Sequence, residues 1–242
     1  MDKAHFTKAY DLRASDFDAR CRLKPGALFD LLQDAAGQHA MRLGAGYSDM
    51  LKKNLLWVVV RQKVVILRAP EMYETVRVTT WPREAKRLDF QREYRVESEN
   101  GEEIARGSSQ WALIDAQTRR VKLVHGVFDL DRYDETPGLG EKLTRLPDFE
   151  AGENVAAAPI YTDLDSNGHV NNTRYADLAY SAVPEQARRE YKSVQIDFHK
   201  EVHLGDTVLL SHYTDGDRTL VKGECGTERM FTCAFEWRDR EP

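Results

Sequence analysis

The sequence lacks the features that mark several large classes of protein. It has only three cysteines, Cys21, Cys225 and Cys233, and their spacing is not that of a metal-binding motif. No stretch approaches the roughly 18 consecutive apolar residues of a membrane-spanning helix, and the N-terminus has neither the apolar core of a signal peptide nor the acid-poor stretch of a transit peptide. We therefore expect free thiols in a reducing compartment, a cytoplasmic location and no membrane association.

Charge of one sign and nucleotide-binding motifs are also missing. The 40 acidic residues outnumber the 35 basic ones only slightly, so no nucleic-acid partner is expected. No phosphate-binding glycine loop or serine nucleophile elbow is present. His199 and His203 are four residues apart, but they share a face only loosely in a strand-like segment and zinc would need a third ligand. We expect no metal and no cofactor.

What the sequence does contain is enough apolar material for real cores, because 41% of its 242 residues are hydrophobic. Residues 6–12 and 17–23 alternate like short strands. Apolar residues then recur at helical spacing from Pro25 to Leu43, and Gly44 stops the pattern. A short turn, with Ser48 as a possible cap, is expected next. Strand-like segments with an Asn100-Gly101 turn before the last of them follow at residues 55–67, 74–81, 88–97 and 103–114.

The second half of the chain repeats this order. An offset of 132 residues carries Glu74 to Asp206 and Val76 to Val208, and the last strand patterns also correspond. An α+β fold of two similar units is therefore predicted. We expect an N-terminal domain over residues 1–130, a linker rich in Asp, Glu, Pro and Gly over 131–150, and a C-terminal domain over 151–242.

The most polar stretch lies at the start of the second predicted helix, which should begin near Val170 or Asn171 and end before Pro184. Residues 163–172 contain two carboxylates, three asparagines and a histidine. Helix capping explains Asn171, Asn172 and Thr173 in part. It does not require the three alternate polar residues before them, Asp165, Asn167 and His169. These could lie on one side of an extended or turning segment, in which Gly168 allows close approach.

The string Asp-Leu-Asp-Ser-Asn-Gly-His-Val-Asn-Asn-Thr-Arg-Tyr at residues 163–175 resembles the signature of the acyl-acyl-carrier-protein (acyl-ACP) thioesterases. Residues 52–61, 74–81, 105–111 and 118–120 also match that family. The resemblance implies a double hot-dog fold, in which a helix is wrapped by an antiparallel sheet in each of two tandem domains. It also implies hydrolysis of fatty acyl-ACP, with the acyl chain in a tunnel of the N-terminal domain.

The resemblance assigns catalytic roles to Asp165, Asn167, His169 and Glu201. Plant-type members have a cysteine directly after the glutamate, whereas this chain has Val202, so a thiol nucleophile is excluded at that position. We expect Glu201 to activate a water that His169 and Asn167 hold, and Asp165 to orient one of them. In a rival scheme Asp165 is the base or the nucleophile.

Backbone N–H groups at the helix start are expected to stabilise the oxyanion, and His169 and Val170 are the candidates. An acidic carrier protein also needs a local basic surface. The candidate basic residues are Arg83, Lys86, Arg87, Arg119, Arg120 and Arg174.

Three questions stay open at this point. An acyl-CoA thioesterase of the hot-dog type is one alternative function, because the Gly-His-Val-Asn-Asn part of the string also occurs in such enzymes. A non-catalytic module that binds acyl thioesters is another, since a fold alone does not give a function. A homodimer is possible.

Overall fold

The computed structural model describes residues 4–85, 88–123, 133–152 and 154–239. The chain divides into two compact units. The first contains Met1–Asp16 and Asp30–Leu143, and the second contains Phe17–Phe29 and Thr144–Pro242. The segment 17–29, which the predicted domain limits placed in the N-terminal domain, thus groups with the second unit.

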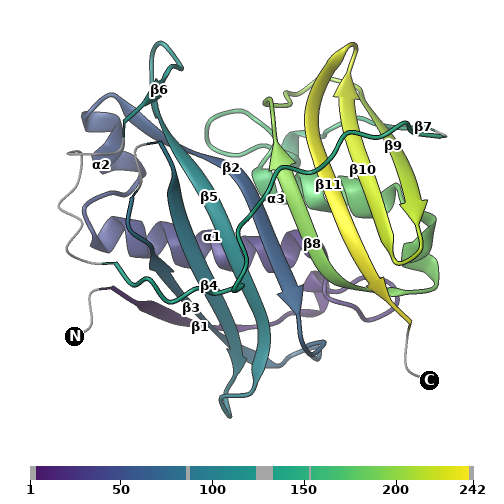
Figure 1. Cartoon of the computed structure of the whole chain (residues 1–242), viewed down its shortest axis with the longest axis horizontal. Helices are drawn as coiled ribbons and strands as arrows, with labels where there is room; N and C mark the ends of the chain where they lie inside the picture. The colour runs from purple at the N-terminus through teal and green to yellow at the C-terminus, as the bar shows by residue number, and fades with distance from the viewer. Residues whose placement is uncertain (1–3, 86–87, 124–132, 153, 240–242) are drawn as a thin grey trace. The chain divides into compact units, whose positions relative to one another are not determined.

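The first unit is built on an antiparallel sheet with the strand order β1-β3-β4-β5-β2 (Figure 1). A strand of two residues, β6, pairs with the end of β5. The strands lie close to the predicted segments, which are rich in β-branched and aromatic residues, and the second half of β2 and the first half of β3 alternate in burial. They are β1 (Phe6–Asp11), β2 (Leu55–Ile66), β3 (Thr75–Pro82), β4 (Phe90–Ser98), β5 (Glu103–Asp115) and β6 (Val121–Lys122).

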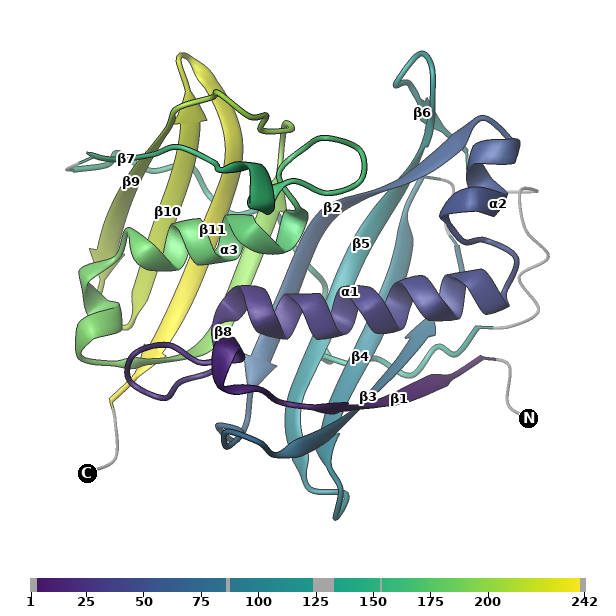
Figure 2. The ribbon, with the colours of Figure 1, turned by 180° about the vertical axis from the view of Figure 1, so that it is seen from behind.

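Helix α1 (Pro25–Arg42) runs along one face of this sheet (Figure 2). Pro25 occupies the first helical position, where its missing N–H costs nothing, and Gly44 follows the helix with a positive φ of 68°. Leu32 and Ala35 are completely buried. The helix predicted from apolar spacing is therefore confirmed.

The turn expected after this helix is a short helix instead. Helix α2 (Tyr47–Lys52) begins after Gly46, and Ser48 lies inside it rather than at its cap. Met50 is fully buried and packs with Phe90 and Leu113. This apolar anchor lies in a stretch of only six helical residues, which is too short for the apolar period to be recognised in the sequence.

The second unit repeats the arrangement of the first. Its antiparallel sheet has the order β7-β9-β10-β11-β8, which matches β1-β3-β4-β5-β2 strand for strand. Helix α3 (Asn172–Ser181) lies across this sheet, as α1 does in the first unit (Figure 2). The strands are β7 (Asn154–Ala157), β8 (Glu190–Phe198), β9 (Val208–Asp215), β10 (Arg218–Cys225) and β11 (Glu228–Arg238). The predicted α+β fold with an internal repeat is confirmed.

Aromatic side chains fill the space between α3 and its sheet. The Tyr180 ring lies 5.7 Å from that of Phe235, and Tyr191 and Trp237 pack around the same pair. Phe235 is fully buried and Trp237 is 1% exposed. Large rings of this kind bury much apolar area and fix the position of α3 over the strands.

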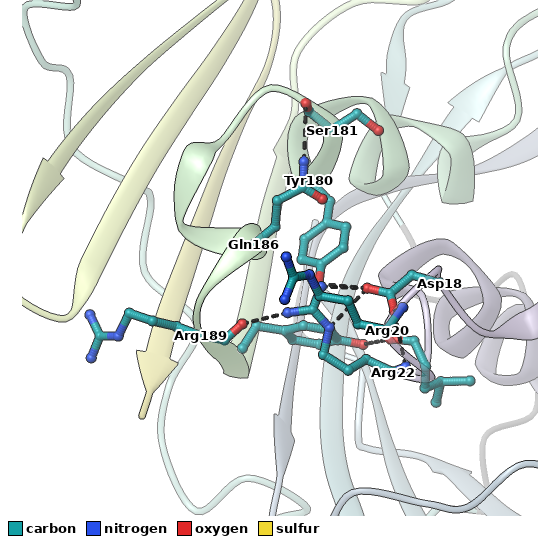
Figure 3. Close-up of polar contacts among 9 residues, drawn as sticks. Asp18, Arg20, Arg22, Tyr180, Ser181, Gln186 and Arg189 are labelled. Carbon is teal, nitrogen blue, oxygen red and sulfur yellow. Dashed lines mark hydrogen bonds and ion pairs between the residues drawn. The ribbon is translucent and has the colours of Figure 1, made fainter. Parts of the chain in front are cut away.

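Residues 17–23 do not form the predicted strand. They make a turn closed by a single bridge between Phe17 and Leu23, with Cys21 at a positive φ of 59°. Polar contacts tie this turn to the rest of the second unit (Figure 3): Asp18 accepts hydrogen bonds from Arg22 and from the Tyr180 hydroxyl, and Arg22 reaches the Arg189 carbonyl. The alternation in the sequence did not reveal these partners, because they are more than 150 positions away.

Three short 3-10 helices complete the described elements: Ala14–Asp16, Tyr161–Asp163 and Pro184–Ala187. In the part of the chain that the structure describes, no helix combines the length and the apolar character needed to cross a membrane.

The Asp18 cluster gives a test of stability. Burial would raise the pKa of Asp18, but hydrogen bonds from Arg22 and Arg20 lower it below its usual value. The ionised carboxylate therefore stabilises the fold above the unfolded-state pKa, and this stabilisation is lost as the pH falls through the lower folded-state pKa. We expect Asp18→Asn to lower the free energy of unfolding at pH 7 by about 1–2 kcal/mol and to have a much smaller effect near pH 3.

Urea unfolding of the wild type and the variant at both pH values measures this difference. Asp215→Asn, at the exposed end of β9, is the matched control and should change little at either pH. An equal difference between wild type and Asp18→Asn at both pH values would show that the carboxylate charge is unimportant.

Candidate active site

The predicted polar residues lie in one tight turn of the second unit. Leu164 and Val170 form an antiparallel bridge, and the N–H of Asp165 donates to the carbonyl of His169 at 2.7 Å. Gly168 closes the turn with a φ of +80°, a conformation that other residues rarely adopt. The turn brings Asp165 against Asn167 and against the backbone N–H of His169.

The carboxylate of Asp165 organises this turn. Its Oδ1 accepts the backbone N–H of Asn167 at 2.8 Å and that of His169 at 3.3 Å. Its Oδ2 accepts the Asn167 side-chain amide at 3.3 Å. Both oxygens therefore hold parts of the turn, and the asparagine side chain is oriented by the aspartate.

Glu201 lies next to this turn, three residues after the end of β8. Its Oε1 is 3.4 Å from His169 Nδ1. The side chains of His169 and Glu201 are 25% and 40% exposed, so solvent reaches both. A histidine and a carboxylate in contact at a solvent-accessible position can hold and deprotonate a water molecule.

Backbone pairing fixes the distance between the two segments. The N–H of Val170 donates to the carbonyl of Val202 at 2.9 Å, and His169 forms an antiparallel bridge with His203. Val202 itself is fully buried. The pairing places His169 and Glu201 side by side although they are far apart in the sequence.

Tyr175 is a supporting residue that the sequence analysis missed. It lies on the buried face of α3, and its hydroxyl oxygen accepts the N–H of Val202 at 2.9 Å. Burial raises the pKa of Tyr175 to about 12, so the phenol stays neutral. The only sign of this role in the sequence was the position of Tyr175 at the end of the polar string. It follows Asn171 by four residues, which is about one helical turn.

The start of α3 agrees with the capping prediction. Asn171 is the N-cap, and its side-chain oxygen accepts the N–H of Thr173 at 3.2 Å. The helix ends at Ser181, and the residues from Ala182 to Pro184 lead away from it, close to the predicted end.

The expected oxyanion donors are engaged elsewhere. The N–H of Val170 donates to Val202, and the N–H of His169 is directed at Asp165. The prediction for these two groups needs correction, because the antiparallel pairing and the turn use the N–H groups internally. Sequence position alone cannot show that a backbone donor is already occupied.

The three cysteines lie outside this turn in the sequence. Cys233 is buried in β11 and Cys225 ends β10. Burial raises the pKa of both thiols, which disfavours the reactive thiolate. Cys21, which is exposed, lies in the turn of residues 17–23.

His203 is a second neighbour that the sequence analysis considered only with His199. Its ring lies edge-on to that of His169, with 4.9 Å between the ring centroids. His199 instead places Nε2 3.2 Å from the Thr232 hydroxyl. The two histidines that are adjacent in space are thus His169 and His203, from different segments of the chain.

The predicted basic residues differ in their surroundings. Arg83 is paired with Glu135 at 2.8 Å and with Glu93 at 3.7 Å. Arg174 lies 3.5 Å from Asp177. Arg119 and Arg120 are exposed after β5. Lys86 and Arg87 lie outside the described residues.

The first unit contains a cavity of about 180 Å³ under α1. It is comparable in size to an apolar cavity that binds a benzene-sized group. Most of its wall is apolar, and the buried Arg92, which is bonded to His39 and Thr80, contributes one polar side. Its wall includes Ala36, Gly37, Met50, Trp57 and Phe90.

The contact between Tyr175 and Val202 can be tested by removing one hydroxyl group. We expect Tyr175→Phe to lower the free energy of unfolding by about 1–3 kcal/mol, because the buried N–H of Val202 loses its acceptor. Urea unfolding measures the change. Tyr213→Phe removes a hydroxyl from an exposed ring and is the control. Equal stability of Tyr175→Phe and the wild type would show that the hydrogen bond is unimportant.

Comparison with known proteins supports this interpretation of the fold. The family model for the acyl-ACP thioesterase N-terminal domain matches residues 3–128, and the model for the acyl-ACP thioesterase C-terminal domain matches residues 148–238. A crystal structure of an acyl-ACP thioesterase from Bacteroides thetaiotaomicron superimposes with a TM-score of 0.89 at 25% identity, covering 98% of this chain and 100% of that one. The predicted double hot-dog fold is confirmed.

Two curated plant proteins are similar over most of the chain. The chloroplastic palmitoyl-acyl carrier protein thioesterase of Gossypium hirsutum is 32% identical over 90% of this chain. The chloroplastic oleoyl-acyl carrier protein thioesterase of Coriandrum sativum is 28% identical over 87% of it. The matches span 56% and 63% of those two proteins. With both family domains present in order along one chain, this protein belongs to the acyl-ACP thioesterase family.

Proposed function

We propose that this protein hydrolyses the thioester of fatty acyl-ACP and releases a free fatty acid and the carrier thiol. The observation that supports this most directly is the contact between His169 and Glu201, 3.4 Å apart in a chain of this family. The pair needs no thiol and no serine, because a histidine beside a carboxylate can activate water.

Glu201 is the base in this proposal. It takes a proton from a water that His169 and Asn167 hold, and the resulting hydroxide attacks the thioester carbonyl. The carbon–sulfur bond then breaks, and the proton passes from Glu201 to the departing thiolate. The rival role for Asp165 is disfavoured, because both of its oxygens accept hydrogen bonds from the turn itself.

The oxyanion needs donors other than the N–H groups of His169 and Val170. We assign this role to the first turn of α3, where the N–H of Asn172 has no acceptor within the helix by its position. The positive end of the helix dipole favours negative charge there. One well-placed donor contributes roughly 3–4 kcal/mol to stabilising such a transition state.

The acyl chain is assigned to the cavity of the first unit, where an apolar wall suits methylene groups. This agrees with the predicted division into an N-terminal domain for the chain and a C-terminal domain for catalysis. The carrier is assigned to a basic surface that includes Arg119 and Arg120, which are exposed after β5. The plant relatives are chloroplastic by name, and a cytoplasmic location for this chain stays a prediction, as does a homodimer.

Release of free fatty acid from acyl-ACP tests the proposal. We expect Glu201→Gln and His169→Ala each to lower kcat by about 10²–10⁴-fold, the usual range for losing a general base or its partner. Melting temperatures should stay close to that of the wild type, because both side chains are partly exposed. Glu228→Gln is the matched control, since this exposed glutamate pairs only with the exposed Lys200 among the contacts described.

The same acyl group should also be offered on coenzyme A. Faster hydrolysis of the acyl-ACP substrate supports the proposal, whereas equal or faster hydrolysis of acyl-CoA would identify an acyl-CoA thioesterase. Binding of either thioester without release of fatty acid would identify a binding module. Near-normal rates in Glu201→Gln would remove this residue from the mechanism.

The place of the acyl chain can be tested at Gly37. Gly37 lines the cavity, and a Cβ atom added there meets nothing within 4 Å, so the position has room for a side chain to begin. We expect Gly37→Leu to lower kcat/KM for the longest accepted chain by about tenfold or more relative to chains a few carbons shorter, because excluded methylenes lose their burial. Rates on acyl-ACP of graded length measure this shift.

Gly37→Ala is the control, because it adds only one methyl group and is a better helix former. It should keep the chain-length profile of the wild type. An unchanged profile in Gly37→Leu would show that the acyl chain lies elsewhere.

A further inference from the structure

Three side chains with metal-ligating atoms meet at the candidate active site. The ligating atoms of His169, Glu201 and His203 all lie within 4.8 Å of one another. In the sequence, His199 and His203 lacked a third ligand for zinc. In the structure, His203 instead finds two further ligands, His169 and Glu201, and His199 is not part of the group. Only His203 has no part in the proposed hydrolysis.

The backbone sets two of these ligands in place before any ion binds. His169 and His203 form an antiparallel bridge, and side chains directly opposite each other in such a pair lie on one face with Cβ atoms roughly 5 Å apart. The neighbouring hydrogen bond from Val170 to Val202 holds this register. Binding an ion would then require rotation of side chains and little movement of the backbone.

The ligand set matches zinc chemistry. Two imidazoles and one carboxylate, with a fourth position open to water, are a common coordination for zinc with ligand distances of about 2.0–2.2 Å. Neighbouring ligands of a tetrahedral ion then lie about 3.4 Å apart, and His169 Nδ1 and Glu201 Oε1 are already 3.4 Å apart. The side chain of His203 is 55% exposed, so its ring has room to turn toward the other two.

Asp206 lies beside His203, at a position from which it can support a bound ion. Its Oδ2 accepts the backbone N–H of His203 at 2.8 Å and lies 3.8 Å from the ring atom Nδ1. A carboxylate beside one ring nitrogen directs the other toward a metal and makes it a better ligand. The carboxylates of Asp206 and Glu201 together also place two negative charges near the site, and these attract a divalent cation.

We propose that His169, Glu201 and His203 bind one Zn²⁺ ion, and that this ion reversibly inhibits hydrolysis. The ion occupies the side chains that otherwise hold and deprotonate the attacking water. The inhibition rests on the proposed function, because it requires His169 and Glu201 to be catalytic, whereas the binding itself does not. His203 makes the inhibition specific to chains that have a histidine at this position.

Calorimetric titration with ZnCl₂ tests the binding part. The titration uses the full chain in a Cys21→Ser background, because the exposed thiol of Cys21 is itself a zinc ligand. One ion per chain is expected. His203→Asn should weaken binding by more than about tenfold, because it removes a ligand and even the loss of a partner that supports a ligand costs about that much, and Asp206→Asn should weaken it less. His199→Asn is the matched control and should bind as the parent does.

Release of fatty acid, followed by chromatography rather than by a thiol reagent that competes for zinc, tests the inhibition part. Each variant is compared with its own rate without zinc. Zinc should inhibit the parent and His199→Asn, EDTA should restore the rate, and His203→Asn should resist zinc at the same concentrations.

The outcomes separate the two proposals. Equal affinity in the parent and in His203→Asn overturns the zinc site and leaves the proposed hydrolysis untouched. Binding that depends on His203 but does not slow hydrolysis overturns the inhibition and argues against catalytic roles for His169 and Glu201. A rate that rises with zinc or disappears with EDTA also overturns an inhibitory role.

Discussion

The backbone of Val202 is hydrogen-bonded from both sides, and the candidate site depends on these two bonds. Its carbonyl accepts the N–H of Val170, and its own N–H donates to the buried hydroxyl of Tyr175. Because Val202 is fully buried, either group would be costly to leave without a partner. The bonds set the register between the turn and the segment after β8. That register brings His169 beside Glu201 and opposite His203.

The two units share one framework but differ in the residues that lie beside the helix. Both have a helix over an antiparallel sheet with the same strand order. At the corresponding helix of the first unit, small residues such as Ala36 and Gly37 border an apolar cavity. At α3 of the second, a polar turn precedes the helix and is held by Asp165. An internal repeat thus supplies two separate faces, one suited to a hydrocarbon chain and the other to polar reaction chemistry.

The residues of the polar turn shape the backbone, cap α3 and carry the candidate reactive side chains. A group that is used for one of these purposes is not available for another. Asp165 and Gly168 shape the backbone, and Asn171 caps the helix. The N–H groups of His169 and Val170 are used in the same network and are not left for a substrate. What remains for chemistry is a set of side chains, chiefly His169 and Glu201. The same side chains that suit water activation also suit a divalent ion once His203 is present.

The sequence could predict what depends on local spacing. The apolar period from Pro25, the strand patterns and the repeat gave the α+β architecture, and Gly168 and Asn171 gave the turn and the cap, because these features arise from neighbours along the chain. The sequence failed where partners are distant. The polar anchors of residues 17–23, the acceptor role of Tyr175 and the occupied N–H of Val170 are set by contacts with other segments.

The sequence by itself therefore determined which elements form and which polar residues gather before α3. Glu201 and its role came from resemblance to a family and not from spacing. Only the tertiary structure decided that His169 lies against both Glu201 and His203, and which backbone donors are already satisfied. The physical reason is that register between two paired segments is fixed by hydrogen bonds across the pairing, and such bonds leave no periodic mark in either segment alone.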